Sequence, residues 1–404
     1  MIPFSPPRID QKIIDEVTAV LKSGWITTAS RTKEFERQLS AFCGVERVLC
    51  LNSATAGLEL MLRWFGVKEG DEVILPAYTY AATANVIVHC GAKPVFVDVN
   101  RADFNISIDS IEKAITSHTK VIMPVDFGGM PCDYDRINEL VRSKENVKKF
   151  MPSNAIQEKL GRILVLSDSA HSIGALYKGK RTGSLTDVSV FSFHAVKNLV
   201  TAEGGAIALN LPSSFTLSAL YDELCIKSLH GQNKDAVTKL QKGNWRYDIV
   251  EAGYKCNMTD IAAAIGLVEL GRYTSDTLIK RKKIVDLYSE LLGKHSWAEL
   301  PLFSDPQRIS CFHLYPLRIH DISEEKRDEM IKLISSDDVS VNVHFIPVPM
   351  MSFYRSLGYD IKNYPMAFAN YSREISLPVF YDITEDQVKE VVNTVVKAYA
   401  QVTK

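Results

Sequence analysis

The stretch Ser192-Phe193-His194-Ala195-Val196-Lys197-Asn198, followed by Thr201-Ala202-Glu203-Gly204-Gly205-Ala206, is the most informative part of the chain. It places a lysine in a loop rich in serine, histidine and glycine. Apolar runs at 188–192 and 205–209 predict a strand on each side of this loop. The glycines after the lysine indicate that the backbone passes close to a ligand. Most lysines are surface residues, so the setting rather than the residue type makes Lys197 a candidate functional group.

A second candidate lies 29 residues upstream, where Asp168-Ser169-Ala170-His171 follows the apolar run 163–166. A carboxylate at the end of a strand either caps the next turn or, when buried, needs a cationic partner. Asp168 and Lys197 together meet the requirements of pyridoxal phosphate (PLP). The lysine amine forms a Schiff base with the cofactor aldehyde, the internal aldimine, and the carboxylate holds the pyridine nitrogen protonated. We therefore expect PLP as cofactor, with Lys197 also acting as acid and base.

Strands and helices alternate over the first two-thirds of the chain, which predicts an α/β fold. After helices at 8–22 and 31–42, the expected strands are 45–51, 72–75, 94–99, 121–125 and 163–166, and the helices between them are 58–65, 81–89, 108–114 and 134–142. Such an order predicts a mostly parallel sheet covered on both faces. Ligands of these sheets bind beyond the carboxyl ends of the strands, where Thr55, Tyr80 and Asp168 are expected.

The last third predicts a second unit. Helices are expected at 260–270, 278–292, 324–334 and 385–400, and strands at 313–319 and 339–345. A chain of 404 residues is long for one core. We predict a large PLP-binding domain over 1–270, with an N-terminal arm at 1–25, and a small α/β C-terminal domain over 271–404. The polar segment 143–161 is interpreted as a surface insertion.

The composition is typical of a globular protein, with 46% apolar and 24% charged residues and a net charge of -1. The basic cluster at 279–283 is interpreted as a solvated helix face, so no nucleic-acid partner is expected. Seven scattered cysteines indicate unpaired thiols in a reducing compartment, and no metal site is predicted. There is no signal-peptide pattern and no long apolar run, so we expect a cytoplasmic protein without a membrane partner.

Further cofactor contacts follow from residues placed just after strands. In Asn52-Ser53-Ala54-Thr55-Ala56-Gly57, small residues stand where a strand turns into a helix, which favours an anion such as a phosphate. The Thr55 and Ser192 hydroxyls and the Ala56 N–H are the expected phosphate donors. Tyr80 could lay its ring against the cofactor, and His171 either stacks near the ring or supports Asp168. Each of these residues could equally be ordinary core or surface.

Taken together, ordered blocks along nearly the whole chain resemble the DegT/StrS sugar aminotransferases, which belong to the fold type I, aspartate aminotransferase-like PLP enzymes. The matching blocks are 2–7, 23–28, 52–57, 168–171, 192–205, 254–260, 343–347 and 377–378. The resemblance implies a PLP-dependent transaminase that moves an amino group, usually from glutamate with release of 2-oxoglutarate, to a keto group of a nucleotide-linked sugar. Surface polysaccharide or glycan biosynthesis is the implied destination.

The resemblance also implies a homodimer with shared active sites. Asn257 would then reach the cofactor phosphate of the neighbouring subunit. Substrate contacts are implied for a wider set, namely Trp25, Ile26, Thr27, Arg246, Lys255 and His344.

The chain departs from the family where Ala29-Ser30 replaces a common Gly-Pro, in a loop that would need a positive φ. Two other functions stay open. Some relatives are sugar dehydratases with histidine in place of the lysine, whereas this chain has Lys197. A non-catalytic sensor on a PLP fold would not need the full set of Lys197, Asp168 and a phosphate site.

Overall fold

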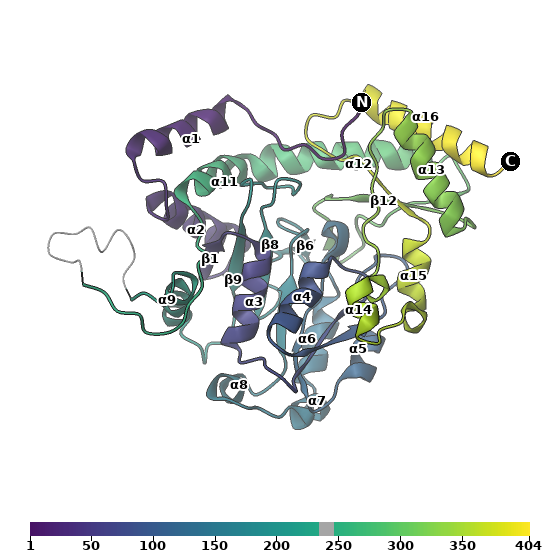
Figure 1. Ribbon diagram of the computed structural model, residues 1–404. Helices are drawn as coiled ribbons and strands as arrows, with labels where there is room; N and C mark the ends of the chain where they lie inside the picture. The colour runs from purple at the N-terminus through teal and green to yellow at the C-terminus, as the bar shows by residue number, and fades with distance from the viewer. Residues whose placement is uncertain (234–245) are drawn as a thin grey trace.

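A seven-stranded sheet forms the centre of the computed structural model, which describes residues 1–233 and 246–404 (Figure 1). Its strand order is β1-β9-β8-β5-β4-β2-β3. The strands are β1 (Arg47–Leu51), β2 (Glu72–Pro76), β3 (Lys93–Val97), β4 (Thr119–Ile122), β5 (Leu164–Asp168), β8 (Val188–Ser192) and β9 (Gly205–Leu209). Only β9 runs against the others in this sheet, pairing antiparallel with β1 and β8. The predicted mostly parallel α/β sheet is confirmed.

Helices cover both faces of this sheet, as the fully buried strands β5, β8 and β9 require. They are α2 (Ser30–Cys43), α3 (Ala54–Trp64), α4 (Ala81–His89), α5 (Ile108–Ala114), α6 (Tyr134–Arg142), α7 (Lys144–Lys149), α8 (Ala155–Leu160), α9 (Leu217–Ser228) and α11 (Asp260–Arg272). In Figure 1, α3 and α4 lie side by side in front of the sheet. The first helix, α1 (Gln11–Ser23), packs on α11.

A smaller sheet of order β10-β12-β13 lies in the C-terminal part. Its strands are β10 (Ala298–Glu299), β12 (Tyr315–Ile319) and β13 (Glu374–Leu377), with α12 (Leu278–Leu292), α13 (Glu324–Ser336) and α16 (Glu385–Val402) packed around them. Two short helices, α14 (Ser352–Ser356) and α15 (Pro365–Tyr371), contribute to the core of the large sheet. A third, small sheet consists of β11 (Arg308–Ile309), β6 (Leu176–Tyr177) and β7 (Lys180–Arg181). The domain boundary near residue 270 stays a prediction.

The N-terminal segment packs on the C-terminal part. Ile2 pairs with Val339 and is buried in the same apolar cluster as α12 and α16. The predicted strand 339–345 is wrong, because the segment makes only isolated pairs, Val339 with Ile2 and Asn342 with Ser376. The segment lies next to Ile2 at its start and next to Ser376 of β13 further along. Neither neighbour forms a continuous run of strand hydrogen bonds with it.

The insertion 143–161 lies largely on the surface, as predicted, and it contains α7 and α8, which the buried side chains of Asn146 and Gln157 anchor. The interpretation of the basic cluster needs correction. Within the basic cluster 279–283, Arg281 is buried and its guanidinium donates to the carbonyls of Phe312 and His313 at 2.9 and 2.7 Å. Because α12 turns this one side of its surface inward, the cluster is not a uniformly solvated face.

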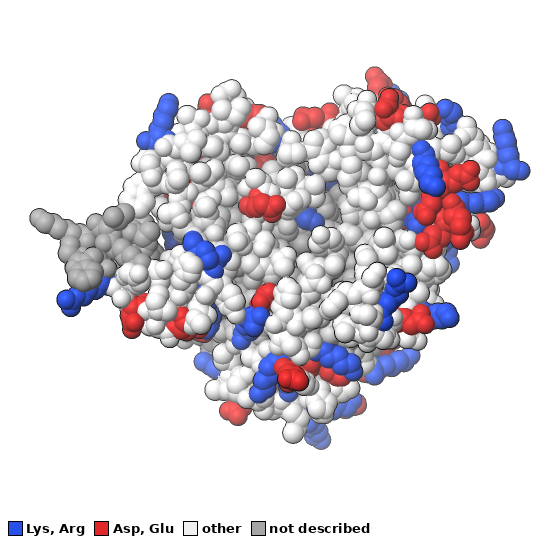
Figure 2. All heavy atoms as spheres, viewed as in Figure 1, with Lys and Arg blue, Asp and Glu red and all other residues white. Residues whose placement is uncertain are grey.

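On the face drawn in Figure 2, basic and acidic side chains are mixed and lie largely toward the rim. Over the described residues, no helix combines the length and apolar character needed to span a bilayer. All seven cysteines lie in the described part and none forms a disulfide.

The start of α2 is capped from another helix. Ala29 at the N-cap has no capping side chain, and the carboxylate of Asp260, the first residue of α11, takes over this role. It accepts hydrogen bonds from the N–H groups of Ala29, Arg31 and Thr32 and from the Thr32 hydroxyl, at 2.7–3.0 Å. Ala29 has a φ of -153°, so the expected need for a glycine with positive φ is wrong.

Asp260→Ala is expected to lower the free energy of unfolding by about 2–4 kcal/mol, because it leaves several buried donors without an acceptor. Urea denaturation measures the change. Asp286→Ala is the matched control, since Asp286 makes only an exposed pair with Lys282 in α12 and should cost less than about 0.5 kcal/mol. Equal effects of the two variants would contradict this account of the α2 cap.

Candidate active site

A cavity of about 550 Å³ opens beyond the carboxyl ends of the parallel strands. Seven of the residues singled out from the sequence line it: Thr55, Tyr80, Asp168, His171, Ser192, Lys197 and His344. They come from the ends of β1, β2, β5 and β8 and from the segment after α13. The size is typical of small-molecule sites, so the sheet brings these groups into one binding cavity.

Lys197 lies in the turn that follows β8, where its N–H donates to the carbonyl of His194 at 2.8 Å. Burial lowers the pKa of the Lys197 amine to about 8, and the carboxylate of Asp168 opposes this effect. An amine with that pKa is unprotonated often enough to act as a nucleophile near neutral pH. Lys197 therefore has the chemical state that attachment of an aldehyde requires.

Asp168 is the last residue of β5 and is buried. The Thr83 hydroxyl donates to its Oδ2 at 2.8 Å, and the Ala170 N–H donates to its Oδ1 at 3.2 Å. Burial nevertheless raises the pKa of Asp168. A carboxylate in this state is stabilised by a cation placed against it, such as a protonated pyridine nitrogen.

The turn from β1 into α3 provides the polar end of the cavity. Ser53 is the N-cap of α3 and its Oγ accepts the Ala56 N–H at 3.1 Å. The predicted Ala56 donor is therefore already used by Ser53, and Ala56 is not among the cavity-lining residues. Ala54 and Thr55 begin the first turn of α3, whose N–H groups have no acceptor within the helix. Together with the Thr55 hydroxyl they suit an anion.

Gly205, after Lys197, packs closely against another part of the chain. A Cβ at Gly205 would lie 2.4 Å from the backbone nitrogen of Ala54 and from the carbonyl carbon of Ser53. Any side chain there would push the start of α3 away from β9. The close approach at Gly205 is therefore to the turn that begins α3, while Gly204 lines the cavity itself.

Aromatic rings form one wall of the cavity. His171 stacks on Phe345 with ring centroids 5.8 Å apart, and Tyr80 lies 5.8 Å from Phe345 on another side. The Gly128 N–H donates to His171 Nδ1 at 3.3 Å. Burial lowers the pKa of His171 well below its usual value, so the ring is neutral with its proton on Nε2. Tyr80 is 64% exposed, so its face is available to a flat ligand.

Several lining or supporting residues were not predicted from the sequence. Phe4 and Ser5 reach the cavity from the N-terminal segment, where Phe4 stacks on His344 and the Ser5 hydroxyl donates to the Val196 carbonyl at 3.2 Å. Thr83 holds Asp168, and His313 lies 4.4 Å from the His171 ring. Phe4 and Ser5 lie in the block 2–7 that resembles the family, but the sequence assigns neither them nor Thr83 and His313 a role, and tertiary packing places all four here.

The remaining predicted substrate and cofactor residues do not line this cavity in the single chain. They are Trp25, Ile26, Thr27, Arg246, Lys255 and Asn257. Asn257 donates from Nδ2 to the Thr28 hydroxyl at 2.5 Å and accepts a hydrogen bond from the Lys255 amine. Trp25 and Ile26 are 39% and 49% exposed. These side chains lie on the outside of the subunit, where a partner could use them.

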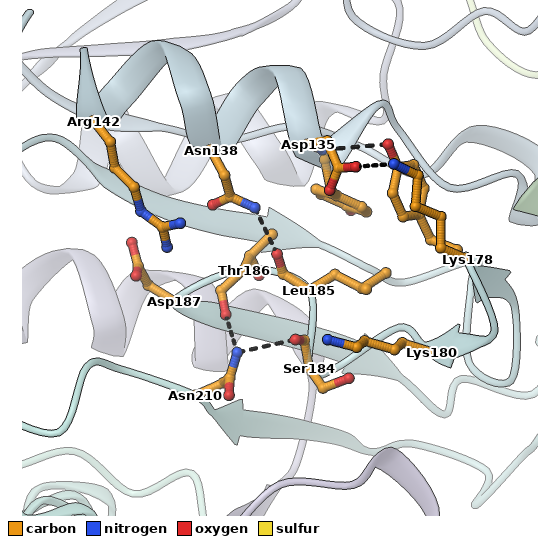
Figure 3. Close-up of a pocket in the computed structure, with 12 residues that line it drawn as sticks. Asp135, Asn138, Arg142, Lys178, Lys180, Ser184, Leu185, Thr186, Asp187 and Asn210 are labelled. Atoms are coloured by element: carbon orange, nitrogen blue, oxygen red, sulfur yellow. Dashed lines mark hydrogen bonds and ion pairs between the residues drawn. The ribbon is translucent and has the colours of Figure 1, made fainter. Parts of the chain in front are cut away.

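A second pocket of about 300 Å³ lies between α6, the β6–β7 hairpin and the loop before β8 (Figure 3). Asp135 and Lys178 form an ion pair at its rim, while Asp187 pairs with Arg162 at 2.7 Å. Lys180 points into this pocket in Figure 3. It shares no lining residue with the cavity around Lys197, so the two pockets are separate.

The residues of the main cavity fit PLP. A buried carboxylate with a raised pKa suits the ring nitrogen, a lysine with a lowered pKa suits the aldehyde, and the first turn of α3 with the hydroxyls of Thr55 and Ser192 suits the phosphate. The three features lie around one cavity, as a single ligand with those three groups demands.

Attachment of PLP to cofactor-free protein is expected to accelerate about tenfold per pH unit up to about pH 8 and then level off, because the lowered pKa of Lys197 sets the fraction of unprotonated amine. At pH 7 this fraction is about one in ten, compared with about one in three thousand for an ordinary lysine. Stopped-flow absorbance follows the reaction. A rate that keeps rising to pH 10 would mean that burial does not lower the pKa of Lys197.

Comparison with known proteins gives consistent matches over the whole length. The model of the DegT/DnrJ/EryC1/StrS aminotransferase family matches residues 7–396. The spore coat polysaccharide biosynthesis protein SpsC of Bacillus subtilis is 35% identical over 401 residues, covering 98% of this chain and 96% of SpsC.

Solved structures agree with this. The sugar aminotransferase Spr1654 of Streptococcus pneumoniae, in its PMP form, superimposes with a TM-score of 0.95 at 44% identity and full coverage of both chains. PseC of Helicobacter pylori, an aminotransferase in pseudoaminic acid biosynthesis, superimposes with a TM-score of 0.85 at 27% identity over 99% of each chain. Spr1654 is also known in a PLP form, with a TM-score of 0.94.

Proposed function

The chain belongs to the DegT/DnrJ/EryC1/StrS aminotransferase family and is a PLP-dependent sugar aminotransferase, and on that premise we propose that it moves an amino group from glutamate to a keto group of a nucleotide-linked sugar. The observation that carries the proposal is that Lys197, whose pKa is lowered, and the buried Asp168 both line the same cavity. The roles of SpsC in spore coat polysaccharide biosynthesis and of PseC in pseudoaminic acid biosynthesis support a place in surface polysaccharide or glycan biosynthesis. A cytoplasmic location is part of the same proposal.

When bound, PLP supplies an aldehyde that takes up the amino group and a ring that stores an electron pair. Lys197 would hold the cofactor between turnovers. Its Nζ, when free, would remove the proton from the carbon that carries the substrate amine. Asp168 holds a proton on the ring nitrogen, and Thr55 and Ser192 hold the phosphate. Because Lys197 is lysine and not histidine, its amine favours transamination over dehydration.

Tyr80 and His171 are proposed to lie against the cofactor ring, as their position on the aromatic wall supports. His344 is proposed to contact the substrate, because it lines the same cavity. The Phe4 ring packed on His344 narrows that side of the cavity and helps to exclude water.

We propose that two copies of the chain share their active sites. Asn257 would reach the phosphate of the cofactor in the partner subunit. Trp25, Ile26, Thr27, Arg246 and Lys255 would contribute to its substrate site. Exposed apolar residues in the same regions support an interface: Trp25, Ile26, Tyr247, Ile249, Val250 and Tyr254 are each at least 39% exposed. Sedimentation of the purified protein as a monomer at working concentration would contradict this assembly.

The two half-reactions can be tested separately on purified protein. Glutamate should shift the near-visible absorbance of the bound cofactor, and a nucleotide-linked keto sugar added afterwards should restore it. A panel of such sugars, with 2-oxoglutarate as the positive control for restoration, identifies the acceptor. If 2-oxoglutarate restores the absorbance and no keto sugar does, the proposed sugar acceptor is wrong although the enzyme is an aminotransferase.

A further inference from the structure

A buried chain of polar groups leads from β13 to the main cavity. Glu374 and Ser376 are both 0% exposed. Glu374 Oε1 lies 2.5 Å from Ser376 Oγ, and Ser376 Oγ lies 2.9 Å from His344 Nδ1. The other carboxyl oxygen, Oε2, accepts the backbone N–H of His344 at 3.0 Å. Because Nδ1 is hydrogen-bonded to Ser376, the other ring nitrogen of His344, Nε2, is the one that can bond to a ligand in the cavity.

We infer that Glu374 and Ser376 are positioning residues that set the hydrogen-bonding role of His344 Nε2 in the active-site cavity. The inference deepens the proposed function and rests on it, because it concerns a side chain of the proposed substrate site. Neither Glu374 nor Ser376 lines the cavity, so both act through His344.

The hydroxyl of Ser376 has one proton, so the chain can run in two directions. When Glu374 is ionised, Ser376 donates to the carboxylate and accepts from His344 Nδ1–H, and Nε2 is then an acceptor. When Glu374 is protonated, its proton lies on Oε1, because Oε2 already accepts the His344 N–H. Ser376 then donates to Nδ1, and Nε2 carries a proton and donates into the cavity.

The change between the two states is balanced. Raising the pH removes the proton from Nε2 to the cavity, the Ser376 proton passes to Nδ1, and the Glu374 proton passes to Ser376. The charge of the imidazole ring stays zero, and the lost positive charge appears as the new carboxylate on Glu374. A protonated Nε2 suits a carboxylate, phosphate or keto oxygen, whereas an unprotonated Nε2 suits a hydroxyl.

Burial raises the pKa of Glu374 to about 8, opposed by its hydrogen bonds with Ser376 and the His344 N–H and by the charges of Arg327 and Arg318. Arg318 of β12 pairs with Glu299 at 3.0 Å, and Arg327 of α13 donates to the backbone carbonyl of Glu374 at 2.9 Å. Neither guanidinium forms an ion pair with the carboxyl group of Glu374. The donor state of Nε2 is therefore favoured below about pH 8.

The groups that face His344 keep its ring neutral. Burial and the charge of Lys197 lower the pKa of His344 to about 3. His171 and His313 lie in the same part of the cavity, and burial lowers the pKa of both well below the usual value. Tyr78 donates from its hydroxyl to the His344 carbonyl at 2.5 Å, and burial raises its pKa, so it stays neutral. The change at His344 is thus a change of tautomer.

The test is nitrogen NMR of ¹⁵N-histidine-labelled full-length protein with its cofactor bound, recorded from about pH 6 to about pH 10, which brackets the pKa of Glu374. His344→Gln identifies the signals of His344 among the nine histidines. In the unsubstituted protein the proton should move from Nε2 to Nδ1 as the pH rises.

Two variants separate the relay from other causes. In Glu374→Gln the side-chain amide donates to Ser376 at every pH, so Nε2 should stay protonated throughout. In Ser376→Ala the hydroxyl that connects Glu374 to His344 is missing. The His344 tautomer should therefore not change as the pH is raised across the same range. An unchanged tautomer in the unsubstituted protein overturns the inference. The same transition in Glu374→Gln also overturns it, because it would assign the change to a group other than Glu374.

The same transition in Ser376→Ala would also overturn it. Because the measurement reads the protein's own nitrogens, it succeeds or fails independently of which amino donor and sugar the enzyme uses. A correct tautomer switch with no sugar turnover would contradict only the proposed function.

Discussion

Lys197→Ala is expected to abolish multiple turnover, with kcat/KM lower by at least about 10³-fold, because no other lysine lines the described cavity to hold the cofactor and move the proton. The rate of amino transfer from glutamate measures the loss. Mass spectrometry after borohydride reduction should also find no cofactor on the chain, whereas the unsubstituted protein carries it on Lys197.

Lys180→Ala is the matched control for this variant. Lys180 is an exposed lysine of the second pocket in Figure 3 and should leave kcat/KM within about twofold. Repeated turnover by Lys197→Ala at more than about a tenth of the normal rate would rule out Lys197 as the essential group.

Asp168→Asn is expected to lower kcat/KM by about 10²- to 10³-fold, since removing one partner of a buried charge pair costs about 3–5 kcal/mol. The asparagine keeps the shape of the side chain and can still accept from Thr83, so the fold should be retained. Its neutral amide cannot hold a proton on the cofactor ring nitrogen. Steady-state kinetics and the absorbance of the bound cofactor give the effect.

Asp135→Asn is the control for this substitution, because Asp135 lies in the second pocket and pairs with the exposed Lys178. It should keep nearly full activity. An Asp168→Asn enzyme with kcat/KM within threefold of normal would show that the carboxylate does not stabilise the charge on the ring.

Much of the large sheet could be predicted from the sequence, and the reason is local. The helices α4, α5 and α6 and the strands β8 and β9 have the predicted bounds, because the strands are apolar runs and the helices carry apolar residues at helical spacing, as at Ile137 and Val141. The start of α1 was predicted three residues too early, since Asp10 caps the helix through the Ile13 N–H.

The segment 339–345 shows where local reasoning fails. It alternates like a strand, but Ile2 and Ser376 each take only one pair with it. The partners come from both ends of the chain, and no local pattern reports them.

In the site, too, some residues are placed by local sequence and others by contacts between distant segments. Asp168 and Ser192 end their strands, and Thr55 and Lys197 lie within a few residues of a strand end, so the sheet brings all four together. Phe4 and Thr83 reach the cavity or its carboxylate through packing between distant segments. Glu374 was missed because it lies outside every predicted strand and motif, and only its contact with Ser376 and the His344 N–H relates it to the cavity.

The most direct test of the proposed function uses ¹⁵N-labelled glutamate, a panel of nucleotide-linked keto sugars and the purified enzyme, with the products weighed by mass spectrometry. The account predicts that one sugar gains a labelled amino group in place of its keto oxygen and that 2-oxoglutarate accumulates in equal amount. The opposite result, loss of water from a sugar without uptake of label while the cofactor remains bound to Lys197, would contradict it.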